Sequence, residues 1–288
     1  MANNKITNKI FSYNSCIIIF VSVLLLSCGG SSTTIRPGDS IQEAFVKANR
    51  LFELESYSQA ASAFETVVNL GRATEFGREA QFKLAESYFH DGRYMLAASE
   101  FKRYREFYPR ADKLPQADFR RALAYYKMSP RYKLDQENSK KAIELFNLFI
   151  SRYPDHDKVD DADGYIQDLR NKLAHKNYHA AQLYLRLEQY KAAAIYLDVT
   201  INQYPDSKWA EKALAEQINT YVRYANRSIQ SKKADRYQKA IESYEKYLQL
   251  FPDGDNRSLA EEYYDDALRK LEEMEGSIDN QTVSKSKS

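Results

Sequence analysis

GRYMLAASEFKRYREFYP, residues Gly92 to Pro109, contains the spacing from which most of the fold can be predicted. Its apolar side chains recur at steps of three and four residues, at Tyr94, Ala97, Phe101 and Tyr104. Such steps place them on one face of an α-helix, and Pro109 then stops the helix. A second helix is expected upstream over residues 79–89, with Gly92 in the turn because glycine tolerates a positive φ. The stretch therefore predicts a pair of packed helices.

The same spacing recurs in four other places along the chain. The matching sets are Tyr57, Ala60 and Phe64; Ala142 and Phe146; Tyr190, Ala193 and Leu197; and Tyr237, Ala240 and Tyr244. Paired helices with a Gly turn, a closing proline and small residues at the crossing point are typical of the tetratricopeptide repeat, although the copies here are further apart than its roughly 34 residues. We therefore predict an all-α fold, a tetratricopeptide-repeat superhelix over residues 41–275 with about five helix pairs and a C-terminal helix.

The composition agrees with helices that interlock through aromatic side chains. The 288 residues include 23 Tyr and 14 Phe but only 9 Gly and 7 Pro, which is few turn formers for a sheet protein. The formal net charge is +2, and charges of both signs are mixed along the chain. No nucleic-acid partner is therefore expected.

Residues 1–27 have the organisation of an export signal peptide. Two lysines precede an apolar run over residues 16–26 that is too short to span a bilayer. The sequence LLSC, which ends at Cys28, resembles the lipobox of bacterial lipoproteins, in which the signal is cut before the cysteine and that residue is acylated. We therefore predict lipidation at Cys28 and a flexible tether over residues 28–40. An ordinary cleaved signal and an uncleaved membrane anchor are the alternatives.

Two further observations on the N-terminal segment bear on location. Cys16 would leave with the signal, so no pair of thiols would remain for a disulfide after export. Gly29 follows Cys28, whereas an Asp there would indicate retention in the inner membrane in the best-known sorting systems. The predicted location is the outer membrane, with the helical part in the periplasm.

A more specific resemblance emerges from the order of the motifs. They are the interrupted third repeat, Ala142 with Phe146 and Phe149, Tyr153-Pro154, the long run over residues 173–190, and Tyr204-Pro205. In this order they resemble the BamD (YfiO) family of outer-membrane lipoproteins of the β-barrel assembly machinery, over about residues 41–251. The chain departs from that pattern at its ends. The first repeat lacks Tyr-Pro, repeat five has extra residues near 225–236, and an acidic helix over 258–275 follows it. The tail over residues 276–288 is expected to be disordered.

The resemblance implies a non-catalytic scaffold. Members of the family bind unfolded outer-membrane β-barrel proteins through their N-terminal repeats, and a POTRA-containing barrel subunit of the machinery through their C-terminal repeats. Two alternatives stay open: a periplasmic coordinator of cell-wall synthesis and envelope constriction, and an outer-membrane lipoprotein that binds nutrients. The first usually has a coiled coil and no lipid, and the second would be expected to expose several Trp side chains, whereas Trp209 is alone.

Candidate contact residues follow from the helical spacing. Tyr88, Tyr125 and Tyr184 are the candidates for partner binding, because a tyrosine on an inner helix face joins a large contact area to one polar group; packing between repeats is the alternative for each. No catalytic residue, metal site or cofactor other than the lipid on Cys28 is expected. His175 and His179 lack the Glu of the zinc-protease motif, and the acidic loop after Pro154 has Val159 where a calcium ligand would be needed.

Overall fold

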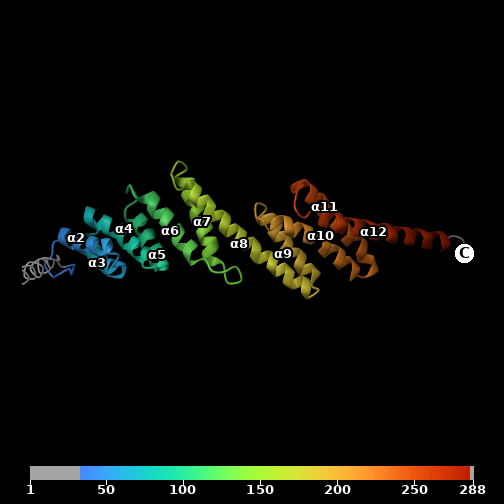
Figure 1. The fold of residues 1–288 in the computed structure, drawn as a ribbon, viewed down its shortest axis with the longest axis horizontal. Helices are drawn as coiled ribbons and strands as arrows, with labels where there is room; N and C mark the ends of the chain where they lie inside the picture. The colour runs from blue at the N-terminus through green and yellow to red at the C-terminus, as the bar shows by residue number, and fades with distance from the viewer. Residues whose placement is uncertain (1–32, 286–288) are drawn as a thin grey trace, which may run out of the picture. The chain divides into compact units, whose positions relative to one another are not determined.

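The computed structural model describes the backbone of residues 33–285 and the side chains of residues 33–276, and all regular structure in that part is α-helical (Figure 1). The predicted signal peptide and Cys28 lie outside the described residues. The chain divides into two compact units, one ending at Tyr108 and the other beginning at Pro109. Along residues 33–285, no helix combines the length and the apolar character that a bilayer crossing requires.

The first unit contains two helix pairs. The helices are α2 (Ile41–Glu53), α3 (Tyr57–Gly71), α4 (Glu75–His90) and α5 (Tyr94–Phe107). Each packs on the next through small residues: Ala48, Ala60, Ala80 and Ala97 are all fully buried. The recurring alanine of the predicted pattern is therefore buried between packed helices, where a larger side chain would hold the backbones apart.

The start of the first unit includes part of the predicted tether. Ser40 caps α2, and its hydroxyl accepts a hydrogen bond from the Glu43 amide while the Glu43 carboxylate accepts one from the Ser40 amide. Upstream, Ile35 packs against the core of this unit, and Asp39 forms an ion pair of 2.7 Å with Lys47. The flexible stretch predicted over residues 28–40 therefore differs from the structure at its C-terminal end, because an apolar side chain and a paired carboxylate hold that end on α2.

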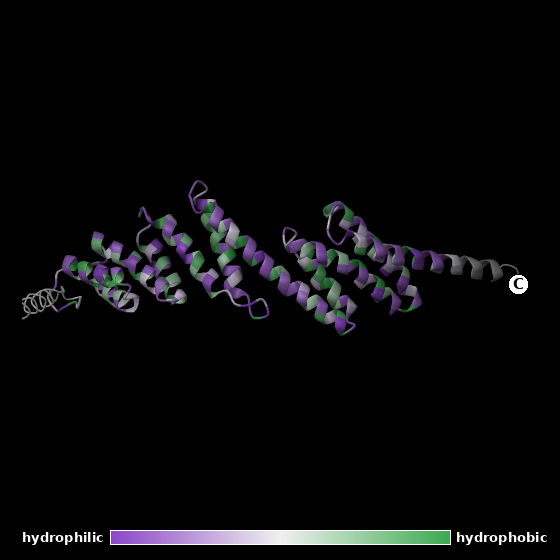
Figure 2. Ribbon diagram, viewed as in Figure 1, coloured by the Kyte–Doolittle hydropathy of each residue, from purple (hydrophilic) through white to green (hydrophobic). Residues whose placement is uncertain are grey.

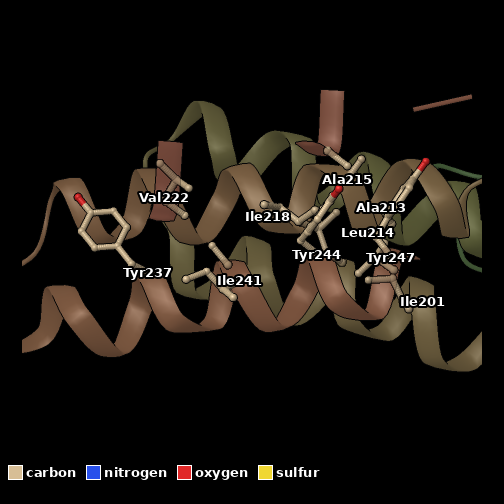
Figure 3. Close-up of a cluster of buried hydrophobic side chains, with 14 of the residues drawn as sticks. Ile201, Ala213, Leu214, Ala215, Ile218, Val222, Tyr237, Ile241, Tyr244 and Tyr247 are labelled. Carbon is tan, nitrogen blue, oxygen red and sulfur yellow. The ribbon is translucent and has the colours of Figure 1, made fainter. Parts of the chain in front are cut away.

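The second unit contains three helix pairs and a final helix. Its helices are α6 (Leu114–Met128), α7 (Glu137–Arg152), α8 (Val159–Arg186), α9 (Tyr190–Gln203), α10 (Ala210–Asn226), α11 (Gln230–Leu250) and α12 (Arg257–Lys285). One cluster of buried apolar side chains in this unit joins α9, α10, α11 and α12, with Ala181 of α8 at its edge (Figure 3). Within each unit the hydrophobic residues gather on the helix faces that meet, and hydrophilic residues cover the outer faces (Figure 2). The amphipathic spacing predicted from the sequence is confirmed.

Four helices end in the same way, at an aromatic residue followed by proline. The C-caps of α5, α7, α9 and α11 are Tyr108, Tyr153, Tyr204 and Phe251, with φ between −127° and −136° and ψ between 54° and 63°. A residue before proline is driven out of the helical region because the proline ring meets its amide and Cβ. The α3 helix lacks this ending, and its C-cap Arg72 keeps helical dihedrals.

The turns inside three of the helix pairs share a residue with positive φ. Gly92 has a φ of 78°, as the sequence predicted, whereas Glu55 and Glu188 occupy the equivalent positions with φ values of 56° and 55°. The left-handed region costs an L-residue roughly 1–2 kcal/mol because its Cβ approaches the carbonyl oxygen. The turns at Glu55 and Glu188 are therefore strained, whereas the turn at Gly92 is not, because glycine has no Cβ.

Replacing Glu55 by glycine is expected to stabilise the first unit by about 0.5–1 kcal/mol, the relief of strain less the added entropy of the unfolded chain. The gain in stability is measured as a shift in the urea concentration at the midpoint of unfolding. Glu65→Gly, at an exposed position inside α3, is the matched control and should destabilise by about 1 kcal/mol. If Glu55→Gly and Glu65→Gly changed the free energy of unfolding in the same direction, strain at Glu55 would not be the explanation.

One helix in the second unit serves two repeats. The α8 helix has 28 residues and is about 42 Å long at its usual rise (Figure 1). Its first half packs on α7 through residues that include Tyr165, and its second half packs on α9 and α10 through residues that include Ala181. Asp160 and Asp161 lie in its first turn, as predicted, where the helix dipole favours negative charge.

The C-terminal helix is held at its start by a network around one carboxylate. Oε1 of Glu211 accepts hydrogen bonds from the Tyr247 hydroxyl at 2.7 Å and from the amide and side chain of Asn256 at 2.7 and 2.9 Å. A Cβ at Gly254 would lie 2.5 Å from the Tyr247 hydroxyl, so the loop requires glycine there. The α12 helix continues to Lys285, which differs from the disordered tail predicted from residue 276.

Candidate functional site

The three candidate tyrosines lie on three different helices. Tyr88 on α4 is half-buried against the core of the first unit, and the Arg93 guanidinium lies 4.9 Å from its ring centroid. Burial raises the pKa of the Tyr88 hydroxyl. Tyr125 on α6 is also half-buried. The contacts of Tyr88 therefore fit the packing alternative, while its partly exposed ring leaves an edge for a partner.

Tyr184 belongs to an aromatic cluster in the second unit. Its ring stacks on Tyr196 with centroids 5.3 Å apart and planes 18° apart. Both Tyr184 and Tyr224 pack against a small buried cluster formed by Leu185, Tyr190 and Ala193. Tyr184 thus packs on α9 through Tyr196, and the cluster it contacts is shared with Tyr224 of α10.

A cavity of about 480 Å³ forms a groove between α9 and α11, with α10 at its base. Each helix contributes one face, since its lining residues are three or four positions apart. The α9 wall consists of Lys191, Ala194, Ile195, Asp198 and Val199, the base of Tyr221 and Tyr224, and the α11 wall of Lys232, Asp235, Arg236 and Lys239. Its volume falls in the roughly 300–1,000 Å³ usual for ligand sites.

The extra residues of repeat five create one wall of this groove. Because α11 begins at Gln230 rather than near Tyr237, about two additional helical turns carry Lys232, Asp235 and Arg236 to the edge of the cavity. Arg236 is fixed there, with its guanidinium carbon 3.5 Å from the centroid of the Tyr224 ring. The insertion is visible in the sequence as extra length, whereas the groove is not. The one sequence feature that points to it is the spacing of the lining residues on α9, which recur at steps of three and four.

A second group of aromatic side chains joins two loops across α8. The His175 ring is stacked between Tyr132, from the loop after α6, and Trp209, from the start of α10, at centroid distances of 3.8 and 4.1 Å. Lys176 Nζ donates to the Leu134 carbonyl at 2.6 Å and fixes the same loop. The His175 ring is thus a packing element that connects the helix pairs on either half of α8.

The environment of His175 predicts a pH dependence of stability. Burial, followed by the nearby His179, Lys208 and Lys133, lowers the pKa of His175 below its ordinary value. The unfolded chain therefore binds more protons near pH 6, and the stability that this residue contributes is present above about pH 6.5 and is lost as the pH falls through the lowered pKa.

The free energy of unfolding is accordingly expected to fall between pH 7.5 and pH 5.5, and His175→Phe, which keeps a flat ring in the stack, should reduce that slope. Urea unfolding at a series of pH values measures both proteins. An equal slope in wild type and variant would show that other groups cause the dependence.

Comparison with known proteins shows which family this chain belongs to. The family model described as YfiO, outer membrane lipoprotein, matches residues 37–236, which is more than half of the chain. The chain belongs to the YfiO family. In this YfiO-family chain the match runs from Pro37, shortly before α2, to Arg236, so it includes α9, α10 and the start of the α11 wall.

The relatives of this YfiO-family chain have low sequence identity to it, but the matches cover most of its length. It is 23% identical over 208 residues to the outer membrane protein assembly factor BamD of Vibrio cholerae, covering 69% of this chain and 86% of the relative. It is 21% identical over 186 residues to BamD of Neisseria meningitidis, covering 61% and 70%, and 20% identical over 232 residues to BamD of Xylella fastidiosa, covering 76% and 79%.

Solved structures with similar helix pairs include the tetratricopeptide-repeat domain of P58(IPK). It matches with a TM-score of 0.40 and 15% identity, covering 81% of this chain and 66% of that one. The TPR2AB domain of yeast Sti1 matches with a TM-score of 0.38 and 14% identity, covering 79% and 98%.

Proposed function

We propose that this protein is a non-catalytic, lipid-anchored subunit of the outer-membrane β-barrel assembly machinery. It is tethered to the outer membrane through acylated Cys28, with its helix pairs in the periplasm. It binds unfolded β-barrel proteins through the first unit and a POTRA-containing barrel subunit, with other subunits of the machinery, through the second. No cofactor other than the lipid takes part.

The observation that carries this proposal is the family match over residues 37–236, which spans four helix pairs and the start of the fifth. Its relatives are named as outer membrane protein assembly factors. Two features of the chain agree with it. Helix pairs offer extended faces that accept a peptide or a helix of a partner, and the LLSC sequence before Gly29 matches a lipoprotein signal.

Depletion of the protein tests the proposal against its rivals. The expected result is a loss of folded barrel proteins from the outer membrane, measured by their heat-modifiable migration on gels. Septation defects with normal barrel levels would favour the cell-wall coordinator, and a growth defect limited to one nutrient would favour the uptake lipoprotein. Purification of the protein from solubilised outer membranes should also recover a POTRA-containing barrel subunit, and its absence would contradict the proposed partner.

A further inference from the structure

We propose that the groove between α9 and α11 binds an acidic, amphipathic peptide segment of a partner protein, with an aliphatic side chain against its base and carboxylates facing both walls. The inference depends on the shape and charge of this groove alone, so it can hold or fail independently of a role in barrel assembly.

The charges of the lining favour an anionic occupant. Four cationic side chains face two carboxylates along the walls. Asp235 is already paired with Lys239, with the ammonium nitrogen 3.3 Å from a carboxylate oxygen, and Arg236 lies over the Tyr224 ring. Within the described part of the chain neither Lys191 nor Lys232 forms an ion pair. Asp198 is the second lining carboxylate and is likewise without an ion pair in that part of the chain, but the cations of the lining outnumber the carboxylates by four to two. Two unpaired ammonium groups, one on each wall, therefore remain for the carboxylates of a partner.

The apolar part of the lining favours a side chain over a small anion. Ile195 on the α9 wall is 55% exposed, and Ala194 and Val199 line the cavity on the same helix face. The base is made of the half-buried rings of Tyr221 and Tyr224. An occupant with an aliphatic side chain would remove this apolar surface from water, which favours binding.

The length of the groove indicates a polypeptide. The α9 wall runs from Lys191 to Val199, which is about 12 Å along the helix axis. An extended chain covers that distance with about four residues. The segment therefore needs an aliphatic side chain for the base and at least two acidic residues close to it in sequence, so that carboxylates can reach the lysines of both walls.

The C-terminal segment of this chain is a poor occupant. Residues 277–288 contain one Asp and two Lys, so their charge has the same sign as that of the groove. The acidic α12 of a second copy is the remaining internal candidate. Asp266 and Glu273 are paired with Arg269, whereas Glu261, Glu262 and Asp265 are exposed. Leu268 and Leu271 of α12 pack against the core of their own chain, so this helix offers carboxylates with few free aliphatic side chains beside them. A separate partner that carries both fits the lining better, and the test below distinguishes it from a second copy.

The test uses the full-length lipidated protein in detergent micelles and a fluorescein-labelled 12-residue peptide in which each leucine is flanked by glutamates. Fluorescence anisotropy should show the peptide binding at least about ten-fold more tightly than a matched peptide with glutamines in place of the glutamates. The Lys191→Glu/Lys232→Glu variant should lose at least ten-fold in affinity. Ile195→Ser should weaken binding by about three- to ten-fold, since Ile195 is exposed and is not needed for folding.

The control is Lys127→Glu/Lys140→Glu, which changes the net charge by the same amount at exposed positions on α6 and α7, away from the groove. It should bind like wild type. Equal loss in both double variants, or equal binding of the two peptides, would overturn the proposal. A concentration-dependent dimer in sedimentation, abolished only by the groove variant, would also overturn it by identifying a second copy as the occupant. Unchanged circular dichroism excludes misfolding as a cause of lost binding.

Discussion

The Cys28→Ser variant is expected to be absent from the outer-membrane fraction and to fail in complementing depletion of the wild-type protein. Serine has no thiol to accept the diacylglycerol group, so the signal stays uncut and no acyl chain is attached. Each buried CH₂ group contributes about 0.8 kcal/mol to membrane binding, and stable anchoring takes more than one chain. Losing the acyl chains therefore removes the whole anchor.

Membrane fractionation and mass spectrometry of the purified protein measure this effect. The wild-type protein should begin at an acylated Cys28, and the variant should retain residues 1–27. Cys16→Ser is the matched control, because Cys16 lies in the segment that is predicted to be removed. It should leave processing and location unchanged. An acylated or correctly cut Cys28→Ser protein would disprove the lipobox assignment.

The Phe146→Ala variant is expected to destabilise the second unit by about 3–5 kcal/mol. Phe146 is fully buried between α6, α7 and α8: its ring stacks on Tyr165 at 5.3 Å and meets Phe119 edge-on at 5.8 Å. Truncation leaves a cavity where three helices meet, and it removes both aromatic contacts at once. Because repeats are stabilised mainly by their neighbours, we expect α6, α7 and the first half of α8 to open first.

Urea unfolding gives the size of this change, and hydrogen exchange shows where opening begins. Leu148→Ala, on the same helix but 37% exposed, is the matched control and should cost less than about 1 kcal/mol. If the two variants lost equal stability, the aromatic contacts around Phe146 would not be the source of the effect. Exchange that accelerated first at α10 and α11 would contradict the local opening.

Most of the helix boundaries were predictable because the signals that set them are local. Residues before proline at Tyr108, Tyr153 and Tyr204 end their helices whatever the surroundings, since the clash involves adjacent residues only. Ser40 begins α2 through a hydrogen bond three residues away. The predicted C-terminal helix ended at residue 275, whereas α12 continues to Lys285. A polar composition does not by itself prevent helix formation, because most polar residues have adequate helix propensity.

The candidate site was predicted less well. Tyr88, Tyr125 and Tyr184 were placed on the correct helices, but their contacts involve residues that the helical spacing does not identify. The ring of Tyr184 meets Tyr196, and Arg236 meets Tyr224, across different helices. The insertion near residues 225–236 was visible as extra length, whereas its role as a groove wall required knowing where α9 lies.

The amino-acid sequence by itself determined the helix pairs, the small residues at their crossing points and the aromatic-proline endings, because each depends on residues within a few turns of one another. Only the tertiary structure decided that α8 serves two repeats, that His175 is stacked between two loops, and that lysines from α9 and α11 face one cavity. The last two arrangements join residues more than 30 positions apart through packing, and no local pattern encodes the distance between them.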